Sequence, residues 1–95
     1  MKKRPKGFSK LDIAELLTSK EEIKRFLEEA AQEEDAEHFA YAVGIAMRAY
    51  GMQKVADKTG LNRGNLYRTF RKGGNPGYIT MSRVLEAMGV TIKIA

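Results

Sequence analysis

The segment from Gln53 to Phe70, QKVADKTGLNRGNLYRTF, constrains the fold more than any other stretch of this 95-residue chain. It predicts a short helix, an interruption at Thr-Gly-Leu, and a second helix that begins at Asn-Arg-Gly-Asn. Gly60 is suited to end the first helix because, without a Cβ, it takes a positive φ at little cost. Two helices joined by a short turn that contains glycine are typical of a helix-turn-helix, which we predict at about residues 52–71.

The apolar residues of this segment are spaced for packing the two helices against each other. Val55, Leu61 and Leu66 are expected to point inward and to fix the crossing angle. Ala56 lies one turn before Gly60, where a small side chain lets the second helix cross closely. Phe70, four residues after Leu66, extends the same buried face. The second helix therefore has one apolar side and one side that packing does not need.

The polar side of the second helix is cationic. Asn62 is a strong N-cap for this helix. A solvated helix usually carries mixed charges, but the ten residues from Arg63 to Lys72 hold four cations and no acid. Arginine offers a fork for the edge of guanine and binds phosphate equally well. We therefore predict that DNA is contacted by Asn62 at the helix start and by the residues that packing leaves free, which are Arg63, Gly64, Asn65, Tyr67, Arg68, Arg71 and Lys72.

Charge is distributed unevenly along the chain, whose net charge is +5. The first ten residues hold five cations and no acid, residues 11–40 hold ten acids and three bases, and residues 41–95 hold nine bases and two acids. A basic C-terminal half suits a polyanion, and an acidic middle suits a basic partner. Taken alone, the acidic run is more typical of a solvated face. Residues 1–8 are predicted to be a flexible basic arm, with contact to DNA phosphates as the alternative.

The chain before the central segment is predicted to be helical. Ser9 can cap a short helix over residues 10–17. The next helix can begin with a capping box, formed either by Thr18 with Glu21 or by Ser19 with Glu22. Residues 9–95 are expected to form one all-α domain of five or six helices.

The remaining boundaries follow from caps and glycines. Asp35 can cap a third helix, which Gly51 ends. A last helix is predicted over 80–88, before Gly89. The tail VTIKIA alternates apolar residues, so it is predicted to be a short extended strand. Packing on its own domain is slightly favoured for this tail over contact with a second copy or another protein.

Several function classes are disfavoured. The chain has no cysteine, so disulfides and thiolate chemistry are excluded and a reducing cytoplasm is expected. No apolar run approaches about 18 residues, so no membrane span is expected. His38, the single histidine, is predicted to flank the core beside Phe39 rather than to bind a metal. The methionines at 47, 52, 81 and 88 are expected in the core. No cofactor motif or catalytic pair is found, so an enzyme is not expected.

The glycine-rich loop KGGNPG, at residues 72–77, lacks the strand–loop–helix context of a nucleotide cradle. Two interpretations of this loop carry equal weight. It can be a plain turn, or it can let the backbone approach a DNA phosphate.

One long stretch of the chain reads MRAYGMQKVADKTGLNRGNLYRTFRKGGNPGYITMSRVLEAMGV. This stretch resembles the lambda-repressor-like (Cro/C1, XRE) superfamily. Within that superfamily it is most similar to the prophage-type addiction module antidotes, or HigA-like antitoxins. This resemblance implies a bacterial or phage protein, cytoplasmic and nucleoid-associated. It implies a homodimer that binds double-stranded operator DNA, represses its own operon and neutralises a RelE/HigB-like toxin. It also adds Gln53 and Lys54 to the expected DNA contacts, although the family often has Ser-Gln there.

Two alternatives remain open. The chain can be a phage or prophage repressor without a toxin partner, or a helical adaptor that binds protein alone. Salt-dependent binding to duplex DNA separates the adaptor from the others. A small RelE-like reading frame beside the gene separates the antitoxin from the plain repressor.

Overall fold

A computed structural model describes residues 12–92 as five α-helices preceded by a short 3-10 helix. In chain order the elements are η2 (Ile13–Leu16), α1 (Lys20–Gln32), α2 (Ala36–Tyr50), α3 (Met52–Thr59), α4 (Arg63–Thr69) and α5 (Tyr78–Ala87). No strand is present within that described range. The prediction of an all-α protein with five or six helices is confirmed.

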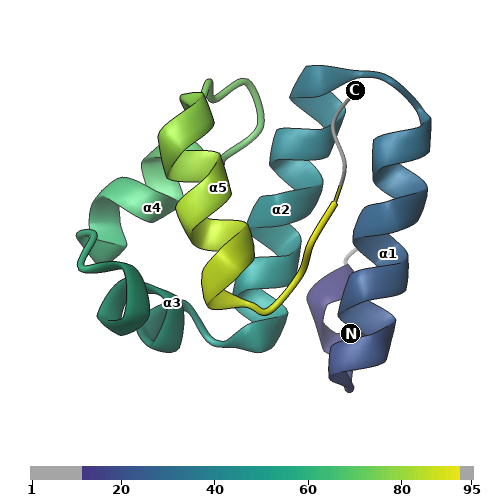
Figure 1. Cartoon of the computed structure of the whole chain (residues 1–95), viewed down its shortest axis with the longest axis horizontal. Coiled ribbons are helices and arrows are strands. Elements are labelled where there is room, and N and C mark those ends of the chain that lie inside the picture. The colour runs from purple at the N-terminus through teal and green to yellow at the C-terminus, as the bar shows by residue number, and fades with distance from the viewer. Residues whose placement is uncertain (1–11, 93–95) are drawn as a thin grey trace, which may run out of the picture.

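The helices are arranged around α2 (Figure 1). Helices α1 and α2 run antiparallel, and α5 lies on the other side of α2 from α1. Helices α3 and α4 lie beyond α5, far from α1. Seven side chains at the centre are almost completely buried, and these are Leu27, Val43, Met47, Val55, Leu66, Val84 and Met88. The predicted burial of the four methionines is confirmed, because Met52 and Met81 are buried as well.

The start of α1 distinguishes the two capping boxes that the sequence allowed. The Ser19 hydroxyl accepts a hydrogen bond from the Glu22 N–H at 3.1 Å, so Ser19 is the cap and the box with Thr18 and Glu21 is wrong. Glu22 reaches back one residue further than in the usual box. Its carboxylate accepts from the Thr18 N–H at 2.8 Å and from the Thr18 hydroxyl at 2.9 Å. The bond from the Thr18 backbone is the main reason that the pKa of Glu22 is lowered.

Helix α2 begins and ends as predicted. Asp35 caps it by accepting a hydrogen bond from the His38 N–H at 3.1 Å, and Gly51 ends it with a φ of 122°. The prediction that His38 flanks the core is wrong, because its side chain is exposed and its Nε2 lies 3.2 Å from the Glu33 carboxylate. Phe39 turns into the core. Neighbouring residues of a helix point about 100° apart, so His38 faces solvent.

The two ends of the described chain differ from prediction. Ser9 lies outside the described residues, and the cap of the described helix is Asp12, whose carboxylate accepts from the Ala14 N–H at 3.1 Å. The helix is a single 3-10 turn, so Ala14 is buried whereas Ile13 and Leu16 are exposed. Helix α5 begins two residues earlier than predicted.

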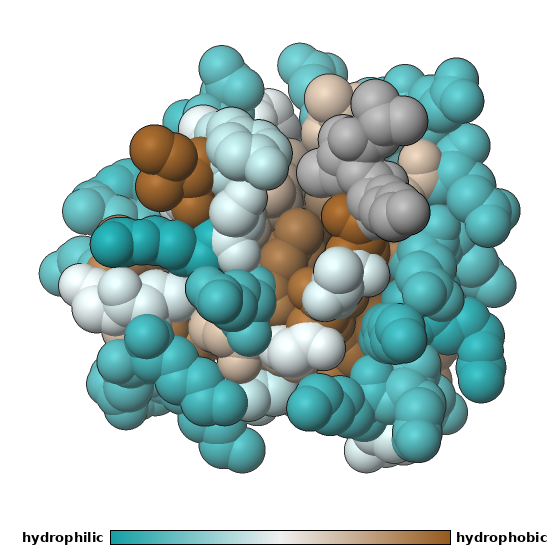
Figure 2. Space-filling view, viewed as in Figure 1, coloured by the Kyte–Doolittle hydropathy of each residue, from teal (hydrophilic) through white to brown (hydrophobic). Residues whose placement is uncertain are grey.

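The tail after α5 is not a strand at Val90 or Ile92. Val90 is buried and Ile92 packs against the core, so the interpretation that this tail packs on its own domain is confirmed for those residues. The rest of the tail, residues 93–95, lies outside the described range. In Figure 2 the helix surfaces are mostly covered by hydrophilic side chains, and apolar atoms show in the recess between α5 and α1.

Candidate nucleic-acid interface

The turn between α3 and α4 is set by Gly60. Its φ of 74° and ψ of 9° are left-handed, and its N–H donates to the Ala56 carbonyl at 2.8 Å. Nothing lies within 4 Å of the position that a Cβ would take, so the backbone conformation rather than space selects glycine. The Thr59 hydroxyl closes the turn by accepting from the Leu61 N–H at 3.2 Å. The predicted position of Gly60 in this turn is confirmed.

Helix α4 is held at both ends. The Asn62 side chain caps its start by accepting a hydrogen bond from the Asn65 N–H at 3.0 Å, as predicted. Leu66 and Phe70 are each 2% exposed and anchor its inner face. At its end the backbone comes very close to α2, because a Cβ on Gly44 would stand 2.7 Å from the Phe70 carbonyl oxygen. This close packing fixes where the outer face of α4 points.

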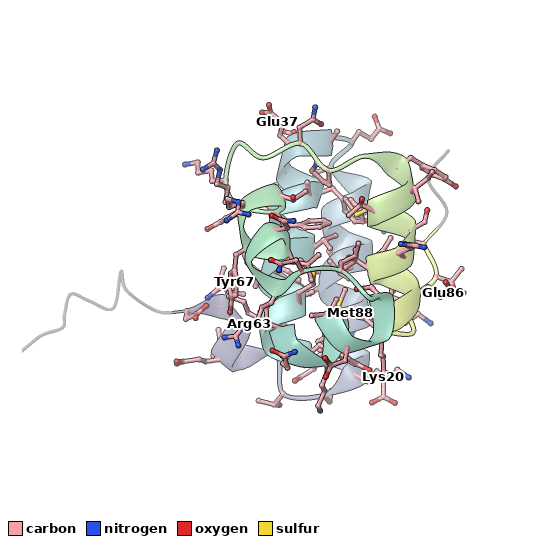
Figure 3. The ribbon with its side chains drawn as sticks, turned by 90° about the vertical axis from the view of Figure 1, so that its left-hand side faces the viewer. Lys20, Glu37, Arg63, Tyr67, Glu86 and Met88 are labelled. Carbon is pink, nitrogen blue, oxygen red and sulfur yellow. The ribbon has the colours of Figure 1, made fainter. Side chains whose placement is uncertain are left out.

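The outer face of α4 carries the polar side chains predicted for it. Exposed residues on and just after the helix are Arg63, Gly64, Asn65, Tyr67, Arg68, Arg71 and Lys72. Figure 3 shows Arg63 and Tyr67 side by side on one flank of the molecule. The Arg63 guanidinium lies 5.8 Å from the centre of the Tyr67 ring, within the range of a cation–π contact. The Arg68 guanidinium donates to the Asn65 side chain.

A chain of side chains supports Arg63 from α3. The Arg63 guanidinium donates to the Gln53 amide oxygen at 3.4 Å, and the Gln53 amide nitrogen donates to Asp57 at 2.9 Å. The structure therefore brings Gln53 to the outer face of α4. Lys54 does not join this group. Its ammonium lies 5.7 Å from the Tyr50 ring, beside Lys58.

The neighbourhood of Lys54 forms a second cationic cluster. Lys58 donates to the Tyr50 hydroxyl and to the Ala87 carbonyl at the end of α5. The hydrogen bond from Lys58 is the main reason that the pKa of the Tyr50 hydroxyl is lowered, and the charges of Lys20 and Lys54 act in the same direction. Lys54 therefore lies beside Tyr50 and is not among the side chains that contact Arg63.

One cation of the candidate interface was missed by sequence reasoning. Arg48, in the last turn of α2, lines a hollow of about 510 Å³ together with Gln53, Arg63 and Tyr67. Its guanidinium is 2.7 Å from the Asp12 carboxylate. The signal in the sequence was weak, because Arg48 precedes the cationic segment by fifteen residues and only the fold brings them together.

The loop after α4 has a packing reason for its glycines. A Cβ on Gly74 would stand 2.1 Å from the Thr69 carbonyl oxygen, and the Gly74 N–H donates to the Arg71 carbonyl at 2.8 Å. This close approach within the chain supports the interpretation of the loop as a turn. Across residues 12–92, no group of three or more histidine and carboxylate side chains is placed to hold a metal ion. Within the same range no helix is both long and apolar enough to cross a membrane.

These features define a small all-α protein that presents a short cationic helix after a hydrogen-bonded turn. The family model of the probable addiction module antidote protein matches residues 7–95. A protein of Haemophilus influenzae (strain ATCC 51907 / DSM 11121 / KW20 / Rd), described as an uncharacterized protein, is 36% identical over 83 residues, which cover 87% of this chain and 86% of that protein. No solved structure matches the chain.

The chain therefore belongs to the family of probable addiction module antidote proteins. This is not a family of enzymes. Membership indicates an antitoxin role and implies a toxin of some kind as a partner.

Proposed function

We propose that this antidote protein is a DNA-binding antitoxin. It uses α3 and α4 as a helix-turn-helix of the lambda-repressor-like, HigA-like type and places α4 in the major groove of its own operator. It thereby represses its operon, and it also neutralises a toxin of the RelE/HigB type encoded beside it.

The DNA-binding part of this proposal is supported by the division of α4 into an apolar side and a cationic side. The residues of α4 that face the core are apolar, and those that face solvent are cationic or polar, with no acid from Arg63 to Lys72. A helix that only needed to be soluble would gain from mixed charges, because like charges one turn apart repel each other. A cationic face with an aromatic ring matches the groove and phosphates of duplex DNA.

We propose distinct roles for the residues of this face. Arg63 stands in the first turn of α4, where a recognition helix meets base edges, and Gln53 and Tyr67 hold its guanidinium. Arg71 and Lys72 follow the helix and are assigned to phosphates. A single short helix reads only a few base pairs, so the protein works as a two-fold dimer on half-sites spaced about 34 Å apart.

The DNA-binding part is tested with duplex DNA from the region upstream of the gene. Fluorescence anisotropy compares the full chain with the double variant Arg63→Ala/Arg68→Ala. The matched control is Lys24→Ala/Arg25→Ala, which removes two exposed cations from α1. The proposal expects the first variant to lose most of its affinity and the control to bind as the wild type does. If both variants bind alike, the cationic face of α4 is not the DNA-binding surface.

The toxin-neutralising part is tested separately. The product of the adjacent reading frame is expressed alone and together with this chain, and growth and mRNA cleavage are measured. Arrest and cleavage that this chain relieves support the antitoxin. A neighbouring product without toxicity supports the alternative of a repressor without a toxin partner, and an absence of DNA binding supports the protein-only adaptor.

A further inference from the structure

A second surface of the protein lies away from the cationic helix. A hollow of about 770 Å³ opens between the end of α1, the start of α2 and the loop that leads into α5. Its floor is apolar and is formed by Ala31, Phe39, Ala40 and Met81. Figure 3 shows Glu37, which borders this hollow, at the end of the molecule opposite Lys20 and well separated from Arg63.

Two large side chains are open to solvent at the start of α5, and one of them lines the hollow. Tyr78, which lines the hollow, is 78% exposed, and its neighbour Ile79 is 71% exposed. Both stand in the first turn of α5, where they contribute little to the core. Exposed apolar surface of this kind beside a hollow is typical of a protein interaction site.

The described border of the hollow carries only negative charge. Its charged members are Glu34, Asp35 and Glu37, and no lysine or arginine of the described chain lines it. Asp35 is already engaged in capping α2, so Glu34 and Glu37 are the carboxylates available to a partner. A second copy of this chain docked here about a two-fold axis would bring these acids towards their own equivalents, and like charges oppose such a contact. A basic partner removes that conflict.

The backbone of Glu34 adds a second indication. Its φ is 57°, in the left-handed region, and it is the one non-glycine residue with a positive φ in the described chain. Glycine or asparagine is usual just after the end of a helix in this conformation. A glutamate stands there in a strained conformation, and strain of this kind concentrates at functional sites.

We propose that this acid-bordered hollow receives an apolar side chain flanked by cations on a basic protein partner. The inference rests on the toxin-neutralising part of the proposed function, because it assigns the surface through which that partner is held. The apolar side chain fills the floor over Ala40 and Met81. The flanking cations meet Glu34 and Glu37, and Tyr78 covers the inserted group.

The test uses the full-length ¹⁵N-labelled chain and three synthetic peptides as probes, KRLFKR, KRSSKR and EELFEE. The first has both required features, the second lacks the apolar centre and the third lacks the cations. KRLFKR is expected to shift the backbone amides of Ala31, Ala40 and Met81 and to bind most tightly. Equal binding of all three peptides, shifts confined to other surfaces, or no shifts with KRLFKR would overturn the inference.

Three variants locate the contact. Glu37→Lys is expected to weaken KRLFKR binding by roughly five- to tenfold, as a reversed charge beside a cation should. Glu86→Lys makes the same charge change on α5, outside the hollow, and is expected to leave binding unchanged. Glu34→Gly is expected to weaken binding while it keeps or raises the melting temperature, because glycine relieves the positive φ. Equal effects of Glu37→Lys and Glu86→Lys would overturn the site.

These outcomes are separable from those that test the proposed function. DNA binding and rescue from the neighbouring gene product are measured without the peptides. If rescue occurs but KRLFKR does not bind in the hollow, the antitoxin stands and the assignment of its partner surface fails.

Discussion

Helices α1 and α4 show two ways of placing charge on the same scaffold. Helix α1 has thirteen residues, buries Ile23, Leu27 and Ala30, and carries both acids and bases on its exposed side. Helix α4 has seven residues, buries Leu66 alone, and carries cations without acids. The mixed charges of α1 offset one another locally, as at Glu21 and Arg25, which are four residues apart.

The charge on the outer face of α4 is therefore not explained by packing or by solubility. A helix of seven residues is unstable in isolation, so α4 depends on its caps, on Gly60 and on its contact with α2. The fold thus constrains α4 tightly while leaving its outer cations without acidic neighbours in sequence. We interpret that combination as a surface built for a polyanion.

The largest effect is expected where α4 touches α2. Gly44→Val would place a side chain against the Phe70 carbonyl, where even a Cβ would be 2.7 Å away. Overpacking of this kind costs about 1–3 kcal/mol of unfolding free energy, and it should also displace α4 and weaken DNA binding. Urea unfolding and anisotropy with operator DNA measure the two effects.

Gly77→Ser is the control for that substitution. Nothing lies within 4 Å of a Cβ at Gly77, and serine is favoured at this N-cap of α5. Its stability should stay within about 0.5 kcal/mol of wild type or rise. Wild-type stability and DNA binding in Gly44→Val would show that α4 does not depend on this contact.

The next largest effect is expected at Arg63. Arg63→Ala should cost about 1–3 kcal/mol of binding free energy on the operator and relax the preference at one base position. Arg25→Ala, which removes an exposed arginine from α1, should bind the operator as the wild type does. Anisotropy with operator and random duplexes measures both. Equal losses on the two duplexes would contradict a base-reading role for Arg63.

How much of this interface could be predicted depends on whether its determinants are local. Gly60 and Asn62 were predictable because a left-handed turn and an N-cap act within a few residues. The cationic outer face was predictable from helical spacing. Arg48 was not, because its place beside Arg63 depends on how α2 meets α4. Lys54 was expected at the interface only from the family resemblance, and its ammonium lies beside the Tyr50 ring.

The same distinction applies to the fold. The caps at Ser19 and Asp35 followed from sequence, although two capping boxes remained possible at α1. Alternation in the tail predicted a strand, but Val90 and Ile92 pack on the helices without a neighbouring strand in the described chain. Periodicity indicates which side chains are buried and does not supply the partner strand that a sheet requires.

A smaller effect is expected from the acid beside Arg48. Asp12→Asn removes a carboxylate 2.7 Å from the Arg48 guanidinium and near Arg63. Freed from Asp12, Arg48 can meet a phosphate, so affinity for all duplex DNA should rise by roughly threefold, which fits the energy of an exposed ion pair. Glu86→Gln, on a distant surface, should have a smaller effect. Weaker binding in Asp12→Asn would mean that Asp12 positions Arg48 for its contact.

The smallest effect concerns the start of α1. The pKa of Glu22 is lowered below its ordinary value of 4.5, chiefly by the hydrogen bond from the Thr18 backbone. Its contribution to stability is therefore present above pH 4.5 and is lost as the pH falls through the lower folded pKa. Glu22→Gln should melt earlier than the wild type at pH 7, and the difference should shrink on acidification.

The control for this prediction is Glu21→Gln, which removes a charge from the same turn without touching the Thr18 hydrogen bonds. Thermal melts from neutral to acid pH compare the three proteins. A melting difference between Glu22→Gln and the wild type that is constant with pH would show that the hydrogen bonds from Thr18 do not favour the ionised carboxylate.

The salt dependence of operator binding shows whether the cations of α4 and its following loop meet DNA phosphates. The logarithm of the binding constant is measured against the logarithm of salt concentration for the wild type, Lys72→Ala and the α1 control Lys24→Ala. We expect a steep slope for the wild type, a slope about one unit flatter for Lys72→Ala, and no change for Lys24→Ala. An absence of binding at low salt, or equal slopes for the two variants, would contradict it.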